Sequence, residues 1–369
     1  MQKIIKYQKQ IFVAFVLITI VNFIFGLYSN RDQVFQRFDY KKWENKYNKS
    51  QWIVPESKNE ISDDDLYVFV GYKYVKGLDP TLLNAEMPPL GKYLIGFFET
   101  VIGIIGAYGI VFSALSLILL FFFNKLVFKS NLLSIIPVAF LSSELLFKEQ
   151  IGVSLLDVQY LSLLLLTFVF VLKKKYLLVG VVAGLFMATK SPFITLVLYS
   201  TILIFFAIRK TLKLKTLVAM PIITGGIYAF SYLKYFLLHH TFIEFLKVQK
   251  YLIHFYQTGA KGVIGAVFPM IFTGYWLTWF NGNQFIKEWT ILWPVIFVLS
   301  FIALYKAFRE RFSNDGILLM GIWFVLYTSF LVFTPIFSRY LLLSIPFMYN
   351  LAIWGLLKLT KPQLLQELS

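Results

Sequence analysis

Several residue types are absent or rare in this sequence, and each absence excludes a class of chemistry. Its 369 residues include no cysteine and only three histidines. Without cysteine there can be no disulfide, thiolate nucleophile or cysteine metal ligand, and three histidines leave little for zinc. Charged residues make up only 15% of the chain, while 58% is hydrophobic and the mean hydropathy is +0.71. Soluble domains are about 45–50% apolar and more charged, so a water-exposed globule is excluded.

Motifs for nucleotide chemistry are also missing from the sequence. It has no glycine-rich phosphate loop, no Walker pattern, no His-Glu-x-x-His helix and no tandem repeat at solenoid periods. Nucleotide-driven transport is therefore not expected.

Acidic residues are few, 19 against 35 lysines and arginines, which gives a net charge of +16. Such a charge could indicate a nucleic-acid partner. The basic residues, however, cluster between apolar runs, for example at 173–175, 209–215 and 306–311. Cytoplasmic loops of membrane proteins have this distribution, so the charge predicts topology and no nucleic-acid partner.

Apolar runs recur along almost the whole chain, and about 20 apolar residues suffice for one helix to cross a bilayer. Together with the basic clusters they predict an all-α, polytopic membrane protein with both termini cytoplasmic. The short pair at 176–208 leaves open a tilted pair, a re-entrant pair or one broken unit. The ten expected crossings lie near residues 10–28, 106–124, 131–147, 153–172, 176–190, 192–208, 216–237, 289–306, 316–334 and 340–358.

Two stretches interrupt this pattern, residues 29–105 and 238–288, and both are expected on the outer face. In the first, three aspartates after Ser62 precede an aromatic segment, which predicts a capped amphipathic helix at the membrane surface. Pro88-Pro89 opens a second interfacial helix. Apolar and charged residues interleave from Phe242 onward, which predicts another amphipathic helix.

The aspartates at 63–65 allow two interpretations from their position alone. Aspartate is favoured at helix N-termini, where its charge meets the helix dipole, and paired carboxylates can also perform acid–base catalysis. The segment 84–93 favours the second interpretation, because it packs two prolines, a glycine, an acid and a base into ten residues at a membrane surface.

These motifs resemble the first outer loop of glycosyltransferase family 39, the protein O-mannosyltransferases and their bacterial relatives. The match is Asp64-Asp65 before an aromatic helix, then Gly77-x-Asp79-Pro80, then Glu86-x-Pro88-Pro89-Leu90-Gly91-Lys92. Weaker matches follow in order at residues 155–157, 184–190 and 337–340. Two positions depart from the family: Asp-Asp replaces its usual Asp-Glu pair, and Met87 replaces a histidine or lysine.

The resemblance implies a single GT-C-type domain over residues 1–369, with an outward cavity that receives a sugar from a polyprenyl-phosphate carrier. The expected enzyme is an inverting hexosyltransferase of the cell (plasma or inner) membrane, with its active site on the extracytoplasmic face. The sugar would be a hexose such as mannose. The acceptor, whether protein, lipid or glycan, stays open.

The resemblance gives roles to acids of the first outer stretch. An acceptor hydroxyl is a poor nucleophile at neutral pH, so a carboxylate should accept its proton during attack on the anomeric carbon. Asp64 matches the family's first acid and is our candidate for this base, with a one-residue slip to Asp63 left open. Asp65 is then expected to cap the helix or to support the base, and Glu86 to orient the acceptor, the sugar or Asp64.

Cations near the outer headgroups should stabilise the phosphate leaving group. The candidates are Arg339, Lys190 and Lys92. For Arg339 the alternative is an anchor among lipid headgroups, and Lys190, beside Pro192, needs a partner or water because it lies between hydrophobic segments. Asp157 opens the fourth crossing, where helix capping and catalysis both remain open.

Two other classes of protein compete with the enzyme. A transporter or flippase of lipid-linked saccharides would also have many crossings, but its ionisable residues would lie at mid-membrane in internal repeats. A non-catalytic subunit would keep the fold and could lose the acids, whereas Asp64 and Glu86 are present. A divalent cation stays open as a cofactor.

Overall fold

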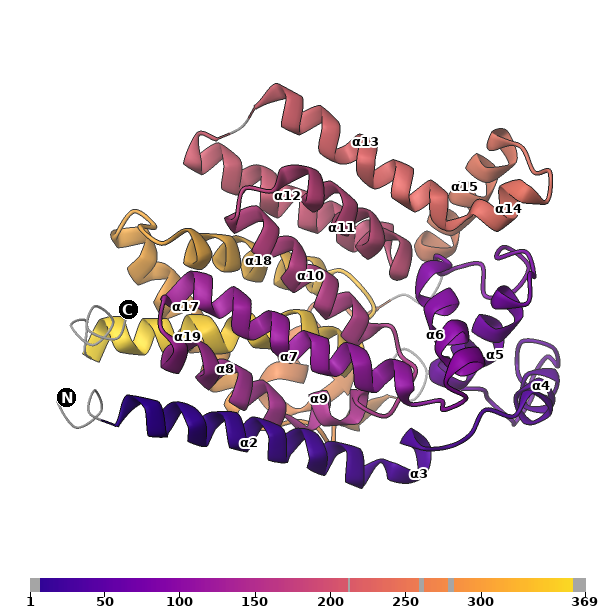
Figure 1. Ribbon diagram of the computed structural model, residues 1–369, viewed down its shortest axis with the longest axis horizontal. Coiled ribbons are helices and arrows are strands. Elements are labelled where there is room, and N and C mark those ends of the chain that lie inside the picture. The colour runs from indigo at the N-terminus through magenta and orange to yellow at the C-terminus, as the bar shows by residue number, and fades with distance from the viewer. Residues whose placement is uncertain (1–6, 212, 259–261, 278–281, 361–369) are drawn as a thin grey trace.

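The architecture is that of a computed structural model, which describes residues 7–211, 213–258, 262–277 and 282–360. Within these ranges the chain is almost entirely helical (Figure 1). The predicted location of the two termini, and parts of the second outer stretch at 259–261 and 278–281, fall outside the described residues.

Apolar helices occupy each predicted crossing within the described part of the chain. They are α2 (Gln8–Ser29), α7 (Ala107–Phe128), α8 (Asn131–Ser143), α10 (Asp157–Leu172), α11 (Tyr176–Thr189), α12 (Pro192–Arg209), α13 (Leu214–Ser231), α17 (Leu292–Arg309), α18 (Asp315–Val332) and α19 (Ile345–Thr360). Six of them, α2, α7, α12, α13, α17 and α18, have the length and composition to cross a membrane. Three others, α8, α10 and α11, are shorter apolar helices. The prediction of an all-α, polytopic membrane protein is confirmed.

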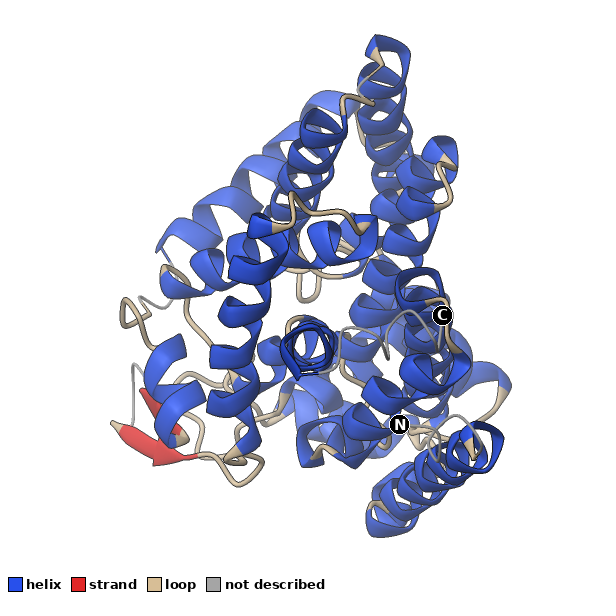
Figure 2. Ribbon diagram, turned by 90° about the vertical axis from the view of Figure 1, so that its left-hand side faces the viewer, coloured by secondary structure: helices blue, strands red, loops and turns tan. Residues whose placement is uncertain are grey.

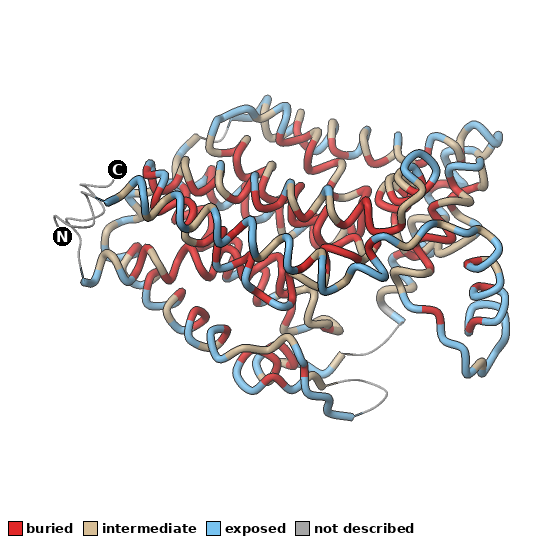
Figure 3. The backbone as a smooth tube through the Cα atoms, turned by 60° about the horizontal axis from the view of Figure 1, so that its bottom comes forward, coloured by how far each residue is buried: buried red, intermediate tan, exposed pale blue. Residues whose placement is uncertain are grey.

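Burial distinguishes central helices from those at the periphery. Thirteen of the 16 residues of α10 are buried, so this helix lies at the centre of the bundle. On α2, by contrast, Val21, Ile24 and Phe25 are 56–63% exposed. Figure 3 shows the same contrast, with buried segments along the inner sides of the bundle. Exposed apolar side chains on such a helix can contact lipid. The helix itself can lie in lipid because its backbone N–H and C=O groups are hydrogen-bonded to one another.

The bundle has two distinct ends (Figure 1). At one, here called the loop end, lie α3 (Arg31–Val34), α4 (Tyr40–Asn48), α5 (Asp63–Val75), α6 (Leu90–Val101), α14 (Leu233–Leu237) and α15 (Phe242–Thr258). At the other, here called the basic end, α2 begins and the basic residues of 173–175, 209–211 and 213–215 lie. Helices α3 to α6 of the first predicted outer stretch and α15 of the second therefore lie at the loop end.

Helices α5 and α6 begin where the sequence predicts them and pack tightly against each other. A Cβ on Gly96 would lie 2.0 Å from the carbonyl oxygen of Gly71, so only glycine permits this crossing. Residues 66–71 of α5 are buried without interruption, since α5 lies enclosed rather than resting one face on a surface. This enclosure fixes the direction of each side chain at its N-terminus.

Short elements complete the described chain. They are α9 (Leu145–Gln150), α16 (Val267–Thr273), the 3₁₀ helix η1 (Ser338–Leu343) and an antiparallel hairpin of β1 (Tyr275–Leu277) and β2 (Asn283–Phe285). The hairpin lies at the edge of the molecule (Figure 2). Its three-residue strands are too short to produce an alternating pattern, so the sequence did not predict them.

Candidate active site

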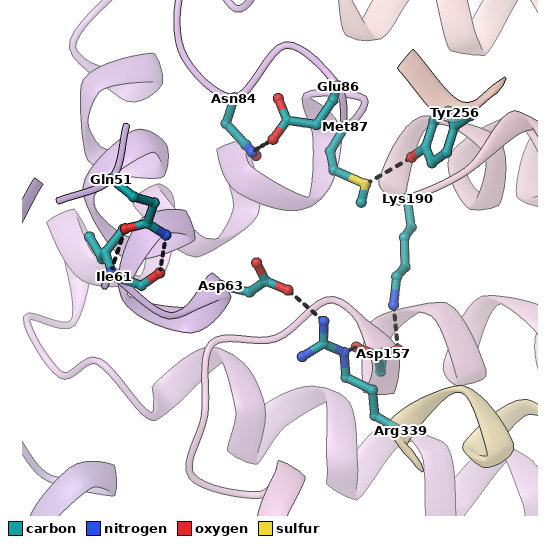
Figure 4. Close-up of polar contacts among 10 residues, drawn as sticks. All are labelled: Gln51, Ile61, Asp63, Asn84, Glu86, Met87, Asp157, Lys190, Tyr256 and Arg339. Carbon is teal, nitrogen blue, oxygen red and sulfur yellow. Dashed lines mark hydrogen bonds and ion pairs between the residues drawn. The ribbon is translucent and has the colours of Figure 1, made fainter. Parts of the chain in front are cut away.

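Four charged side chains from four elements meet at the loop end (Figure 4). Asp63 is the first residue of α5, Asp157 is the first residue of α10, Lys190 follows α11, and Arg339 lies in η1. Arg339 Nη2 donates to Asp63 Oδ2 at 2.5 Å, and its Nε lies 3.7 Å from Asp157 Oδ2. Lys190 Nζ donates to the other oxygen of Asp157, Oδ1. We call these four residues the charged cluster.

Exposure increases across the charged cluster from one side to the other. The side chains of Asp157 and Lys190 are 5% and 7% exposed, that of Arg339 is 19% exposed, and that of Asp63 is 45% exposed. Buried charges are costly unless they are paired, and here each has an opposite partner. Asp63 is therefore the carboxylate that a solute can reach.

The break between α11 and α12 positions Lys190. Pro192 begins α12 and lacks an N–H, so the chain between the two helices leaves helical geometry at Lys190 and Ser191. Tyr160 of α10 holds this break by donating from its hydroxyl to Ser191 O at 3.0 Å and by stacking on Phe186. Residues 176–208 thus form two separate helices, and the break directs Lys190 toward Asp157.

Aromatic rings face the two cations of the charged cluster. Lys190 Nζ lies 4.6 Å from the centroid of the Tyr340 ring, and Arg339 Cζ lies 4.7 Å from that of Phe337. Such contacts favour a cation in a desolvated setting. Both rings belong to the weakly matching segment 337–340, but no aromatic residue was predicted to contact a cation, because 40 phenylalanines and 22 tyrosines make a single ring uninformative.

The three consecutive aspartates point in three directions. Asp63 contacts Arg339, as above. Asp64 instead accepts a hydrogen bond from Gln33 Nε2 at 3.1 Å. Asp65 accepts from Trp43 Nε1 at 3.0 Å and from Lys46 Nζ at 2.7 Å, and so ties α5 to α4. Among the three, Asp63 and not Asp64 joins the charged cluster, and the expected role of Asp65 stays a prediction.

Lys92 holds the loop that ends at the two prolines. Its side chain is fully buried, and its ammonium donates to Asn84 O at 2.6 Å, Asn84 Oδ1 at 3.2 Å and Met87 O at 2.8 Å. Burial lowers the pKa of Lys92 to about 7, against the opposing effect of Glu86. Three loop oxygens thus accept hydrogen bonds from Lys92, and its expected role in binding the donor phosphate stays a prediction without a supporting contact here.

Glu86 lies in the same loop, between the charged cluster and a cleft. Asn84 Nδ2 donates to its carboxylate, and burial, with a further contribution from the negative charge of Asp63, raises the pKa of Glu86. The cleft behind the loop has a volume of about 580 Å³ and is lined in part by Glu86, Trp52, Lys247 and Tyr251. It has aromatic, acidic and basic side chains within one concave surface.

Helix α15 covers the loop from the other side. Tyr256 donates from its hydroxyl to Met87 Sδ at 3.2 Å, and His240, just before α15, contacts Asp79 Oδ2 through Nε2 at 2.9 Å. His240 also stacks on Tyr235. These two contacts join the described parts of the two outer stretches, which the sequence predicted to lie together.

The two carboxylates of the charged cluster are poorly placed to bind a divalent cation. Asp63 and Asp157 already face the cations of Arg339 and Lys190, and a metal ion would have to displace them. Among the described residues no group of three histidine, aspartate or glutamate side chains could hold a metal.

Comparison with known proteins supports the fold. No protein-family model matches the chain, and no curated protein matches it in sequence. Among solved structures it is similar to ArnT from Cupriavidus metallidurans bound to undecaprenyl phosphate, with a TM-score of 0.60 and 14% identity. The apo structure of the same protein gives a TM-score of 0.56, also at 14% identity. In both cases the similarity covers 96% of this chain and 61% of the other. The chain therefore has a GT-C-type membrane fold and spans about three fifths of the length of ArnT.

Proposed function

We propose that this protein is a membrane glycosyltransferase that moves a sugar from a polyprenyl-phosphate carrier to an acceptor hydroxyl. The observation that carries the proposal is Asp63, a half-exposed carboxylate bound to the guanidinium of Arg339 within a buried, charge-paired cluster. A base and a phosphate-binding cation side by side are what this reaction needs. The fold similarity to a protein crystallised with undecaprenyl phosphate supports the choice of carrier.

In the proposed reaction, the acceptor oxygen forms a bond to the anomeric carbon as the bond from that carbon to the phosphate oxygen breaks. The proton of the acceptor hydroxyl passes to a carboxylate oxygen of Asp63, and polyprenyl phosphate leaves with the electron pair of the broken bond. A single displacement of this kind inverts the anomeric configuration. Arg339 and Lys190 stabilise the charge that grows on the phosphate.

Arg339 links donor binding to activation of the base. In the free protein its guanidinium is shared between Asp63 and Asp157. A bound phosphate would compete with Asp63 for the same N–H groups, and Asp157 would keep Arg339 in place. Donor binding would then release Asp63 to accept a proton, so the base becomes active only when the donor is present.

The choice of Asp63 over Asp64 rests on these contacts. Asp64 is the residue that matches the family 39 motif, but its carboxylate faces Gln33 and not Arg339. Glu86, whose charge interacts with that of Asp63, is proposed to orient the acceptor at the mouth of the adjacent cleft. The family 39 resemblance of residues 62–96 supports a hexose such as mannose as the transferred sugar.

The loop end is proposed to lie on the extracytoplasmic side of the cell membrane. The basic residues of 173–175, 209–211 and 213–215 lie at the opposite end, and lysine and arginine accumulate on the cytoplasmic side of membrane proteins. The alternative of a flippase is less well supported, because Asp63 and Asp157 begin their helices at one end of the bundle instead of lying at mid-membrane.

The direct test incubates the purified protein with a panel of polyprenyl-phosphate sugars and acceptors, and measures release of polyprenyl phosphate by mass spectrometry. The proposal predicts release that depends on one sugar class and on Asp63. A protein that moves lipid-linked sugars between leaflets of a vesicle without releasing carrier phosphate would instead be a flippase.

A further inference from the structure

A groove with a basic rim lies at the basic end, far from the charged cluster in the fold. It has a volume of about 530 Å³ and lies between the turn that joins α10 to α11 and the start of α13. Its rim carries Lys174, Lys175 and Lys215, and its walls include Leu177, Leu178 and Ala219. The proposed reaction uses none of these residues.

The rim lysines have no acidic partner, unlike several other cations at this end. Lys306 and Lys358 lie 4.0 Å and 2.9 Å from carboxylate oxygens of Glu310, and Arg209 lies 2.6 Å from one of Asp315. Among the described residues, none of the three rim lysines forms an ion pair within 4.0 Å. Their charge is therefore left for an external anion to balance.

The start of each flanking helix adds to this positive field. Helices α11 and α13 both begin at the groove, and neither has an acidic residue in its first turn or a side-chain cap on its free N–H groups. The N-terminus of a helix carries partial positive charge. The lysines and the two helix starts thus favour an anion from several sides.

The walls of the groove have the character of a lipid contact. Leu177 and Leu178 are 64% and 44% exposed on a membrane helix. Deeper along the same helices α11 and α13 close together, since a Cβ on Gly184 would lie 2.6 Å from Ile227 Cβ. The groove is therefore a wedge, basic at its open rim and apolar along its wall, which matches a phosphate attached to an acyl chain better than a free ion.

We propose that this groove binds the headgroup phosphate of an anionic bilayer phospholipid, with an acyl chain along Leu177 and Leu178. Basic pockets between membrane helices on the cytoplasmic side are suited to such headgroups. The proposal is independent of the reaction at the loop end, and it assigns a second phosphate-binding site to the opposite end of the bundle.

The test measures lipid binding to the full-length, delipidated protein by native mass spectrometry, with phosphatidylglycerol and phosphatidylcholine of identical acyl chains. The double variant Lys174→Gln/Lys215→Gln removes two rim charges. The matched control Lys125→Gln/Lys129→Gln removes one partly buried and one exposed charge from the basic end, outside the groove. Thermal unfolding in detergent without added lipid reports whether each variant is folded.

Phosphatidylglycerol should bind more tightly than phosphatidylcholine, and the rim variant should weaken that binding roughly 25-fold, because each lysine near an anionic headgroup contributes a factor of about five. The control should retain wild-type affinity. Ala219→Trp, which fills the groove without changing charge, should also abolish the preference. Equal binding of both lipids, or equal loss in the rim variant and the control, would overturn the proposal. If millimolar inorganic phosphate alone displaces the lipid, the groove is a site for anions in general and the proposal of a phospholipid site is overturned.

Discussion

An asparagine at position 63 would keep the size and hydrogen-bonding shape of the side chain while removing the carboxylate that we propose as the base. Loss of general-base assistance commonly lowers a rate by ~10²- to 10⁴-fold. The structural cost should be small, because Asp63 is 45% exposed and such ion pairs contribute only ~0–1 kcal/mol to the free energy of unfolding. Arg339 would keep Asp157 at 3.7 Å, so no buried charge is left without a partner.

Donor affinity gives the same variant a second readout. Asp63 and the donor phosphate are proposed to compete for Arg339, so Asp63→Asn should bind a polyprenyl-phosphate analogue more tightly while turnover collapses. A residue with a purely structural role would not change affinity and rate in opposite directions. Single-turnover release of carrier phosphate measures the rate, and titration with the analogue measures the affinity.

Asp64→Asn is the matched control, since it lies one residue away and accepts its hydrogen bond from Gln33. We expect it to retain most transfer activity. The geometric argument is refuted if folded Asp63→Asn transfers sugar at a near-normal rate while Asp64→Asn does not. That outcome would return the role of the base to Asp64, the residue that the sequence motif favours.

Three further predictions follow from the contacts. Arg339→Ala should lower affinity for a polyprenyl-phosphate analogue, measured by titration; unchanged affinity and turnover would make the residue an interfacial anchor. Breaking the buried pair with Asp157→Asn or Lys190→Met alone should lower the free energy of unfolding by ~3–5 kcal/mol, and the double variant by less than the sum, in a double-mutant cycle of unfolding. For Lys92 the pKa falls from 10.5 to about 7 on folding, so the unfolded chain holds its proton between these values and stability should rise with pH there; Lys92→Met should flatten that rise in thermal unfolding scans.

Membrane class and the course of the chain follow from the sequence alone. Long apolar runs and the basic clusters between them are local properties, and a lipid environment admits few solutions other than helices for such runs. Helices therefore appear at the positions of the ten predicted crossings, six of them long and apolar enough to cross a membrane, and others start near residues 63, 90 and 242. The motif around Pro88-Pro89 likewise marked the region that holds the candidate active site.

Only the tertiary structure decided which of the marked residues act together. Consecutive side chains on a helix point about 100° apart, so the packing of α5 between its neighbours determined that Asp63, and not Asp64, reaches Arg339. The contacts of Lys92 were likewise decided by the tertiary structure, because its ammonium group donates to carbonyl oxygens of a loop that folds back over it. The pairing of Asp157 with Lys190 joins residues 33 positions apart, and that of Asp63 with Arg339 joins residues 276 apart. A pattern read along the chain records which residues are present, whereas contacts at such separations exist only once the helices have packed.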